Sequence, residues 1–380
     1  MQMTSSPIFD SFWLGGFECA CHKRADMRRL DLLAATGHDR RAEADYRQLS
    51  SHGIRTVRDG LRWHLIETSP GHYDWSSFLP MLRAAATTRT QVIWDLCHYG
   101  YPDDLDIWSP GFVDRFARFT AAVAQLVKDE TGEVPFYCPV NEISYWAWAG
   151  GTVAKFNPCA IDKGNELKRQ LVRAAVASIE AIRSVDPRAR LISAEPLIHV
   201  TTGAENDPDH VKAAEDYRLI QFEALDLLSG RQEPELGGRP DYVDIVGLNY
   251  YPMNQWYLGG DTIPLGHHAF RPLSGMLEEV YERYRRPILI AETGAEGTGR
   301  ASWLHYIGAE VLEAVRRNIP VEGICLYPIL DYPGWEDERL CAVGLLSHPI
   351  DEESRFVCER TAMELMRQHR LFRPQTAAAE

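Results

Sequence analysis

Two stretches of the chain decide its fold: Val243–Tyr251, with the sequence VDIVGLNYY, and Arg286–Glu292, with the sequence RPILIAE. Each contains a short apolar core, Val243–Asn249 or Ile288–Ala291, and ends in polar residues. Strands of a parallel sheet have this composition because other elements cover both of their faces. Similar runs occur at Phe12–Phe17, Ile54–Gly60, Gln91–Cys97, Phe136–Val140, Arg190–Ala194 and Gly323–Tyr327. Together they make about eight strands, the number that closes a parallel barrel.

Longer segments with apolar residues at helical spacing separate these runs. They are Arg41–His52, Trp75–Thr87, Gly111–Asp129, Asn165–Val185, Pro208–Leu228, Ser274–Tyr284, Ser302–Asn318 and Glu353–His369. The alternation of strand and helix predicts a parallel sheet with right-handed crossovers. We therefore predict an α/β fold, a (β/α)8 TIM barrel that forms a single catalytic domain over residues 1–380. The rival is a doubly wound open sheet, but no G-x-G-x-x-G fingerprint follows a predicted strand.

The composition excludes several classes of protein. The chain has 380 residues, 45% of them hydrophobic, and a formal net charge of -14. That charge argues against binding to nucleic acid or to a membrane surface, since both favour basic patches. No apolar run is long enough to span a bilayer, and the stretch MQMTSSPIFDSFW lacks the pattern of a signal peptide. The 8 cysteines are scattered and predict buried free thiols, so the expected compartment is the cytoplasm.

Polar residues at strand ends are the candidates for an active site, because barrels build their sites at the carboxyl ends of their strands. The fourth predicted strand runs into Asn141 and Glu142, and the seventh ends at Glu292. Two carboxyl groups facing one pocket are the machinery of glycoside hydrolysis, in which one is protonated and the other is ionised. The alternative is that either Glu is a structural ion-pair partner at the rim of the barrel.

Other strand ends supply polar neighbours for this pair. Arg58, near the end of the second strand, could hold Glu292 ionised, or could form a structural salt bridge. His98, at the end of the third, could bind a sugar hydroxyl or be a satisfied structural histidine. Asn249 and Tyr251 end the sixth strand, and the phenol could donate a hydrogen bond to the nucleophile.

Aromatic residues are frequent in the same segments. Rings of this kind stack on the C–H faces of sugars, although core packing is the expected role for some of them. The aromatic candidates are Trp63, Tyr99, Trp146, Trp148, Tyr327 and Trp335.

The ordered set of motifs resembles glycoside hydrolase family 1 and its clan of (β/α)8 retaining glycosidases, the β-glucosidases and β-galactosidases among them. The motifs are FWLGGFECACH, VRDGLRW, LCHYGYPDDL, VNE, VGLNYYP, IAETG and GICLYPILDYPGW, and they cover nearly the whole chain. The resemblance implies that Glu142 is the acid/base and Glu292 the nucleophile. It also implies that Asn141 contacts the sugar 2-hydroxyl and that Tyr251 supports the nucleophile.

Several positions depart from the family pattern. His22 stands nearest the place of a Gln that grips the outer hydroxyls of the sugar, and Tyr327 stands where a Trp is usual. Gly334 precedes Trp335, where the family has a Glu, and Thr293 replaces an Asn. We expect His22, Tyr327 and Trp335 to bind a sugar, but glucose or galactose specificity does not carry over.

The expected function is hydrolysis of a β-glycosidic bond with retention, through a covalent glycosyl-enzyme and without a cofactor. The expected partner is a small glycoside or an oligosaccharide, and the oligomeric state stays open. A transglycosidase and a non-catalytic sugar-binding barrel remain alternatives. The segment ECACH carries metal-ligand chemistry in Glu18, Cys19, Cys21 and His22, but its spacing does not match a usual zinc pattern, so no metal is expected.

Overall fold

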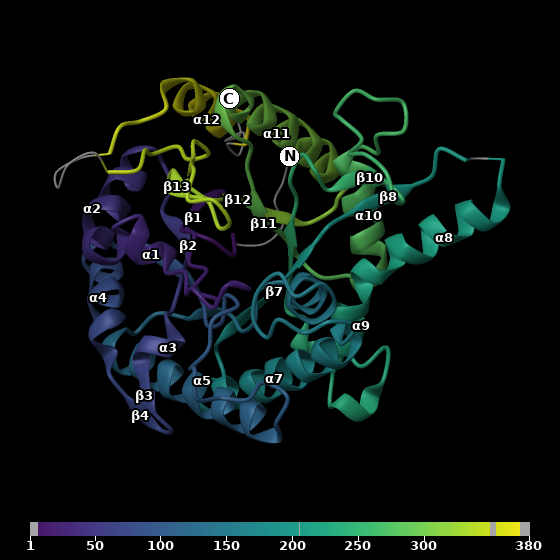
Figure 1. The fold of residues 1–380 in the computed structure, drawn as a ribbon. Helices are drawn as coiled ribbons and strands as arrows, with labels where there is room; N and C mark the ends of the chain where they lie inside the picture. Colours follow the sequence, from purple (N-terminus) through teal and green to yellow (C-terminus); the bar gives the residue numbers. More distant parts are fainter. Residues whose placement is uncertain (1–6, 205, 350–354, 373–380) are drawn as a thin grey trace.

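Eight parallel strands form a closed barrel in the computed structural model, which describes residues 7–204, 206–349 and 355–372 (Figure 1). The strands are β1 (Trp13–Gly16), β2 (Thr56–Gly60), β5 (Gln91–Asp95), β6 (Phe136–Cys138), β7 (Arg190–Pro196), β9 (Ile245–Asn249), β11 (Ile288–Thr293) and β12 (Val321–Leu326). They follow one another around the barrel in chain order, and β1 closes it by pairing with both β2 and β12. The predicted (β/α)8 barrel is confirmed, and the open sheet is excluded.

Helices surround this barrel in a ring (Figure 1). Most of them pack an apolar face on the strands, as the helical spacing in the sequence predicts, whereas α8 (Pro208–Leu219) contributes no residue to the main core. The long helices are α2 (His38–Ser51), α4 (Leu79–Thr88), α5 (Pro110–Glu130), α7 (Gly164–Val185), α8 (Pro208–Leu219), α9 (Glu223–Leu228), α10 (Leu273–Tyr284), α11 (Arg300–Arg316) and α12 (Glu359–Leu371). None of the helices in the described ranges is long and apolar enough to cross a membrane.

Three predicted helices differ from the structure. The segment 208–228 is divided by a 3-10 turn, Ile220–Phe222, and α8 extends outward from the ring (Figure 1). The segment 75–87 begins with a 3-10 turn, Trp75–Ser77, before α4. The last helix begins at Glu359 rather than at Glu353, and residues 353–354 lie outside the described residues. Further 3-10 turns are Pro234–Leu236, Pro240–Tyr242 and Gly297–Gly299.

Short elements that were not predicted occupy the connections that leave the strands. They include the helices α1 (Leu32–Ala35), α3 (Trp63–Ile66) and α6 (Ile143–Trp146), and a π-helical turn, Ala147–Thr152. Three small sheets pair β3 (Glu67–Ser69) with β4 (His72–Tyr73), β8 (His199–Thr201) with β10 (Gln255–Tyr257), and β13 (Tyr332–Pro333) with β14 (Leu340–Cys341). These connections surround the carboxyl ends of the strands, where the sites of such barrels lie.

Alternate strand residues form two separate parts of the core. The larger part joins the strands to the helices and contains Val57, Val246 and Leu248. The smaller part gathers the intervening strand residues, among them Leu14, Ile93, Ile192, Ile245, Leu289 and Cys325, which fill the barrel interior. The side-chain period of two therefore decides which polar residues at the strand ends turn inward.

Candidate active site

Strand alternation places the polar residues Arg58, Asp95 and Asn249 inside the barrel. Val57 and Leu248 pack toward the helices, so their neighbours Arg58 and Asn249 face inward. Likewise, Ile93 belongs to the interior core, and Asp95 follows it two residues later. All three polar side chains are fully buried. Buried groups of this kind require hydrogen-bonded or charged partners. Each side chain has at least one, although Oδ1 of Asn249 has no partner among the described residues.

Glu292 reaches the interior through a β-bulge in β11. Ile288 and Ile290 pack toward the helices, so a regular strand would direct Glu292 to that side as well. The pairing with β9 shifts, because Ile290 lies opposite Leu248 whereas Glu292 lies opposite Asn249. Two steps along β11 thus match one step along β9, which is the signature of a bulge that re-aims a side chain. The bulge brings Glu292 into the barrel next to Arg58.

Arg58 is the cation at the centre of the site. Its Nε and Nη2 bind the two oxygens of Asp95 at 3.0 and 2.9 Å. Its Nη1 donates to Oε1 of Glu292 at 2.7 Å, and its Nη2 donates to Oδ1 of Asn141 at 2.6 Å. Burial alone would lower the pKa of Arg58, but Asp95 and Glu292 outweigh it and raise that pKa well above its usual value. The guanidinium therefore stays charged and fixes three side chains from different strand ends.

Each oxygen of Glu292 accepts one hydrogen bond. Oε1 accepts from Arg58, and Oε2 accepts from the phenol of Tyr251 at 2.9 Å. The side chain is almost completely buried. Burial raises the pKa of Glu292 and nearby Glu142 raises it further, while Arg58 and the hydrogen bond from Tyr251 favour the charged form. The net effect raises the pKa of Glu292 to about 7, and Arg58 is the cation that favours its ionised form.

Glu142 lies in the connection between β6 and α6 and has a left-handed backbone, with φ 45° and ψ 62°. The sheet holds it there, because its N–H donates to the carbonyl of Ala194 at 2.9 Å. Its Oε2 accepts from the phenol of Tyr99 at 2.6 Å, and its Oε1 accepts from Nδ2 of Asn249 at 2.9 Å. Burial raises the pKa of Glu142. Its hydrogen-bond donors are neutral, so this carboxyl group is the one better suited to carry a proton.

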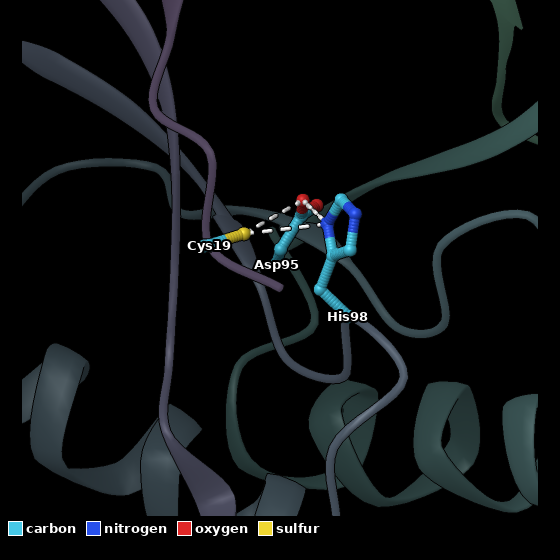
Figure 2. Close-up of side chains that lie close together, drawn as sticks. All are labelled: Cys19, Asp95 and His98. Carbon is cyan, nitrogen blue, oxygen red and sulfur yellow. Dashed lines mark hydrogen bonds and ion pairs between the residues drawn. The ribbon is translucent and has the colours of Figure 1, made fainter. Parts of the chain in front are cut away.

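His98 lies beside Asp95 and Cys19 in the cluster shown in Figure 2. Its Nδ1 is 3.2 Å from Oδ2 of Asp95 and 3.3 Å from Sγ of Cys19. The side-chain amide of Asn141 lies 3.2 Å from the other ring nitrogen, Nε2. Burial lowers the pKa of His98, but its hydrogen bond to Asp95 and the charge of Glu18 raise that pKa overall.

Among the described residues, Cys19, Asp95 and His98 lie close enough together to be considered as metal ligands. The carboxylate of Asp95 is already neutralised, because Arg58 binds its Oδ2 at 2.9 Å. Both oxygens of Asp95 are thus already bound by the guanidinium. The cluster therefore acts as a hydrogen-bonded support that orients His98. Of the ECACH segment, only Cys19 belongs to it.

One cavity of about 880 Å³ opens at this end of the barrel. Glu142 and Glu292 both line it, so the structure brings the two predicted acids together. The predicted residues His98, Tyr251, Tyr327 and Trp335 line it as well, as do the aromatic candidates Tyr99 and Trp148. The volume is ample for a small organic ligand.

The remaining predicted residues lie off the cavity wall. Arg58, Asn141 and Asn249 support the two acids from inside the barrel through the hydrogen bonds described above. His22 is buried, with its ring centroid 4.7 Å from that of Trp335, and burial lowers its pKa to about 3. It therefore stays neutral and packs against an aromatic residue of the wall.

Two of the aromatic candidates belong to the core. Trp63 packs on Phe119 with ring centroids 5.1 Å apart, and its indole N–H donates to Glu67 at 2.7 Å. Trp146 is also fully buried and donates its N–H to the carbonyl of Asn157 at 2.8 Å. The indole N–H of each ring has an acceptor inside the protein. Trp63 and Trp146 therefore have the core-packing role that the sequence analysis expected for some of the aromatic residues.

The sequence interpretation missed Glu18 as a residue of the cavity. Glu18 comes two residues after the end of β1 and lines the cavity together with Tyr145 and Tyr332. The rule that singled out Glu142 and Glu292, a polar residue just after a buried strand, applies to Glu18 too. Glu195, at the end of β7, instead accepts the backbone N–H of Ser144 at 3.0 Å, and burial raises its pKa to about 7.

The sequence matches no protein-family model and no curated protein, whereas the fold has clear counterparts. A β-glucosidase from Thermotoga maritima in complex with glucoimidazole superposes with a TM-score of 0.75 at 13% identity, covering 96% of this chain and 99% of that chain. A family 1 β-glucosidase from the same organism gives a TM-score of 0.72 at 15% identity, with 88% and 87% covered. The AHE enzyme from Alicyclobacillus herbarius gives 0.73 at 16% identity, with 97% and 99% covered. Over most of its length, the chain thus has the (β/α)8 barrel fold of the family 1 β-glucosidases, and the resemblance is confirmed for the fold.

Proposed function

We propose that the protein is a retaining β-glycosidase that hydrolyses a small glycoside or an oligosaccharide. One observation carries the proposal: two acids from different strand ends, Glu142 and Glu292, line the same cavity. Solved β-glucosidases with this fold bind glucoimidazole, castanospermine and deoxynojirimycin, which are sugar-like ligands. A ligand of that kind suits a cavity with aromatic walls and a few polar groups.

The surroundings of the two acids support different protonation states. Arg58 contacts Glu292, so it stabilises the negative charge of a nucleophile there. Glu142 receives hydrogen bonds from the neutral groups of Tyr99 and Asn249. When the pair holds one proton, the charge of Arg58 favours its residence on Glu142.

These states match the two steps of a double displacement. Glu292 attacks the anomeric carbon while Glu142 gives its proton to the departing oxygen, which forms a glycosyl-enzyme. Glu142 then removes a proton from water, which attacks the anomeric carbon and releases Glu292. This mechanism needs no cofactor, and it requires the two carboxyl groups to lie about 5–5.5 Å apart.

The substitution Glu292→Gln tests the nucleophile. It keeps the shape of the side chain but removes its charge, so we expect turnover of aryl glycosides to fall by about a thousandfold or more. Covalent labelling by an activated fluorosugar, followed by mass spectrometry, should disappear as well. The matched control is Glu166→Gln on α7, where the side chain is 61% exposed, and it should keep full activity. Full activity of the Glu292 variant would remove this residue from the mechanism.

The substitution Glu142→Ala tests the acid. General acid catalysis matters most for poor leaving groups and contributes about a hundred- to ten-thousandfold. We therefore expect kcat to fall far more for alkyl glycosides than for dinitrophenyl glycosides. Equal losses for both classes would contradict the role of Glu142. Product analysis with added alcohols or sugars separates hydrolysis from transglycosylation, and binding without turnover of any glycoside would indicate a sugar-binding barrel.

A further inference from the structure

Glu18 is an acidic residue of the cavity that the proposed mechanism does not use. It lines the same cavity as Glu142 and Glu292, and its side chain is 5% exposed. Removing a carboxylate from water is costly unless partners replace the lost hydrogen bonds. The position of Glu18 therefore calls for such partners, and the protein supplies only some of them.

The two oxygens of Glu18 have different surroundings. Oε1 accepts the backbone N–H of Ala20 at 3.0 Å and lies 3.9 Å from Nε2 of His98. Within residues 7–204, 206–349 and 355–372, no group donates a hydrogen bond to Oε2. One oxygen thus anchors the side chain, and the other is available to a ligand in the cavity.

Trp335, a residue of the cavity wall, also carries an unsatisfied polar group. The indole N–H of Trp335 is buried and has no acceptor among the described residues. Buried polar groups almost always have a hydrogen-bond partner, so those left without one point to a bound ligand. A free acceptor on Glu18 and a free donor on Trp335 suit a ligand that carries hydroxyl groups.

The cations beneath the cavity, Arg58 and His98, do not neutralise the negative charge of Glu18. The carboxylates of Asp95 and Glu292 already share the guanidinium of Arg58. His98 is the other cation available, and its Nδ1 faces Asp95 at 3.2 Å. Burial raises the pKa of Glu18, whereas the charge of His98, the N–H of Ala20 and the charge of Arg58 favour its ionised form. With Glu18 ionised, the carboxylates of Asp95, Glu292 and Glu18 outnumber these two cations even when His98 is protonated.

The bases on the cavity wall are also paired. Nζ of Lys168 binds Glu223 at 2.5 Å, and Arg339 forms an ion pair with Glu296. Among the described lining residues, no Lys or Arg is left to neutralise an anionic ligand. A carboxylate or phosphate on the sugar would therefore meet an acidic cavity without a free counterion, and like charges at close range repel strongly.

We propose that Glu18 is a specificity-determining residue that binds hydroxyl or ammonium donors of the sugar through Oε2 and excludes sugars that carry a carboxylate or phosphate. This inference rests on the proposed glycosidase function and names its substrate class as neutral or amino sugars. A purely structural role, in which Glu18 only holds the N–H of Ala20, predicts no such selectivity.

The substitution Glu18→Gln tests the proposal. Gln keeps a carbonyl oxygen for the N–H of Ala20 but lacks the charge. The assay compares kcat/KM for the aryl hexoside that the wild type hydrolyses best with kcat/KM for the aryl uronide of the same configuration. We expect the wild type to prefer the hexoside strongly. In the variant, the ratio of the two kcat/KM values should fall by about tenfold or more.

Glu336→Gln is the matched control. Glu336 is exposed, next to Trp335 and outside the cavity lining, so the same loss of charge there should leave the preference unchanged. A preference that stays the same in folded Glu18→Gln, as judged by its thermal unfolding, would overturn the proposal. Equal rates of the wild type on hexoside and uronide would overturn it without any variant.

Binding separates this inference from the proposed function. If the wild type hydrolyses no glycoside, the glycosidase proposal fails, and calorimetric titration with a methyl hexoside and its methyl uronide still tests Glu18. Tighter binding of the hexoside than of the uronide, with a smaller difference in affinity in Glu18→Gln, would support the inference. Equal binding of both ligands to the wild type would overturn the inference. This wild-type measurement is sufficient even when the variant does not fold.

Discussion

Single residues of the site act through contacts with groups from other strand ends. Tyr251 and Arg58 each donate a hydrogen bond to a different oxygen of Glu292, at 2.9 and 2.7 Å. Tyr99 and Asn249 do the same for Glu142. A carboxylate held at both oxygens cannot rotate freely, so it is oriented before a ligand arrives.

The substitution Tyr251→Phe removes one of these donors without changing the shape of the ring. The hydrogen bond from Tyr251 lowers the pKa of Glu292, so its loss should raise that pKa. We expect kcat to fall by about tenfold and the acidic limb of the pH profile of kcat/KM to move to higher pH. Tyr281→Phe, a change on α10 outside the cavity, is the control. An acidic limb that stays in place would contradict this role of Tyr251.

Glu142 combines a functional side chain with a strained backbone. Its φ of 45° lies in the left-handed region, which Gly adopts more readily than any other residue. Both Glu142→Gly and Glu142→Ala remove the buried carboxyl group, but Ala keeps the steric cost of the backbone. We expect the Gly variant to be more stable by about 0.5–1 kcal/mol, measured by urea unfolding. Greater stability of the Ala variant would show that the backbone relaxes at this position.

At the scale of elements, a buried network joins α2 to the barrel. Nδ1 of His38 binds Asp45 in the same helix at 2.7 Å, and Nε2 binds Asp59 in β2 at 2.9 Å. Tyr46 also donates to Asp59, at 2.5 Å, and Arg355 binds Asp45 at 2.6 Å. A helix, a strand and a segment late in the chain thus share a set of buried charges that balance one another.

This network makes stability depend on pH. Burial alone would lower the pKa of His38, but Asp59 and Asp45 raise it to about 9. A raised pKa stabilises the fold fully below about pH 6.5, the ordinary value, and the effect is lost as pH rises through about 9. We expect the free energy of unfolding to fall by about 3 kcal/mol across that window. His38→Gln should be less stable at pH 6 and should lack this pH dependence, and an unchanged dependence would exclude His38 as its source.

At the scale of the whole molecule, the barrel is closed without any disulfide. All 8 cysteines are free thiols, and only Cys159 and Cys358 are more than slightly exposed. Burial raises the pKa of the interior thiols, for example Cys21 to about 12, so they remain protonated and unreactive at neutral pH.

Thiol chemistry therefore reports on the integrity of the fold. We expect reducing agents to leave Tm unchanged, because no disulfide contributes to it. A thiol reagent should label at most Cys159 and Cys358 in the native protein, and all 8 cysteines after denaturation. A drop in Tm on reduction, or rapid labelling of Cys19 in the native state, would contradict the closed structure.

The sequence by itself determined the number, order and approximate bounds of the barrel strands, because apolar runs and helical spacing are local patterns. It also singled out Glu142 and Glu292, since both lie at the end of a predicted buried strand. Short elements such as α3 and α6 could not be predicted, because four residues are too few to show a period.

Only the tertiary structure decided how the site is assembled. Arg58 and Glu292 are 234 residues apart, and their contact depends on a bulge in β11 that no local pattern reveals. The same holds for Glu18, which becomes a residue of the cavity only when β1 pairs with both β2 and β12. Local sequence encodes which segments become buried strands, but contacts between distant segments are set by how those strands close into one barrel.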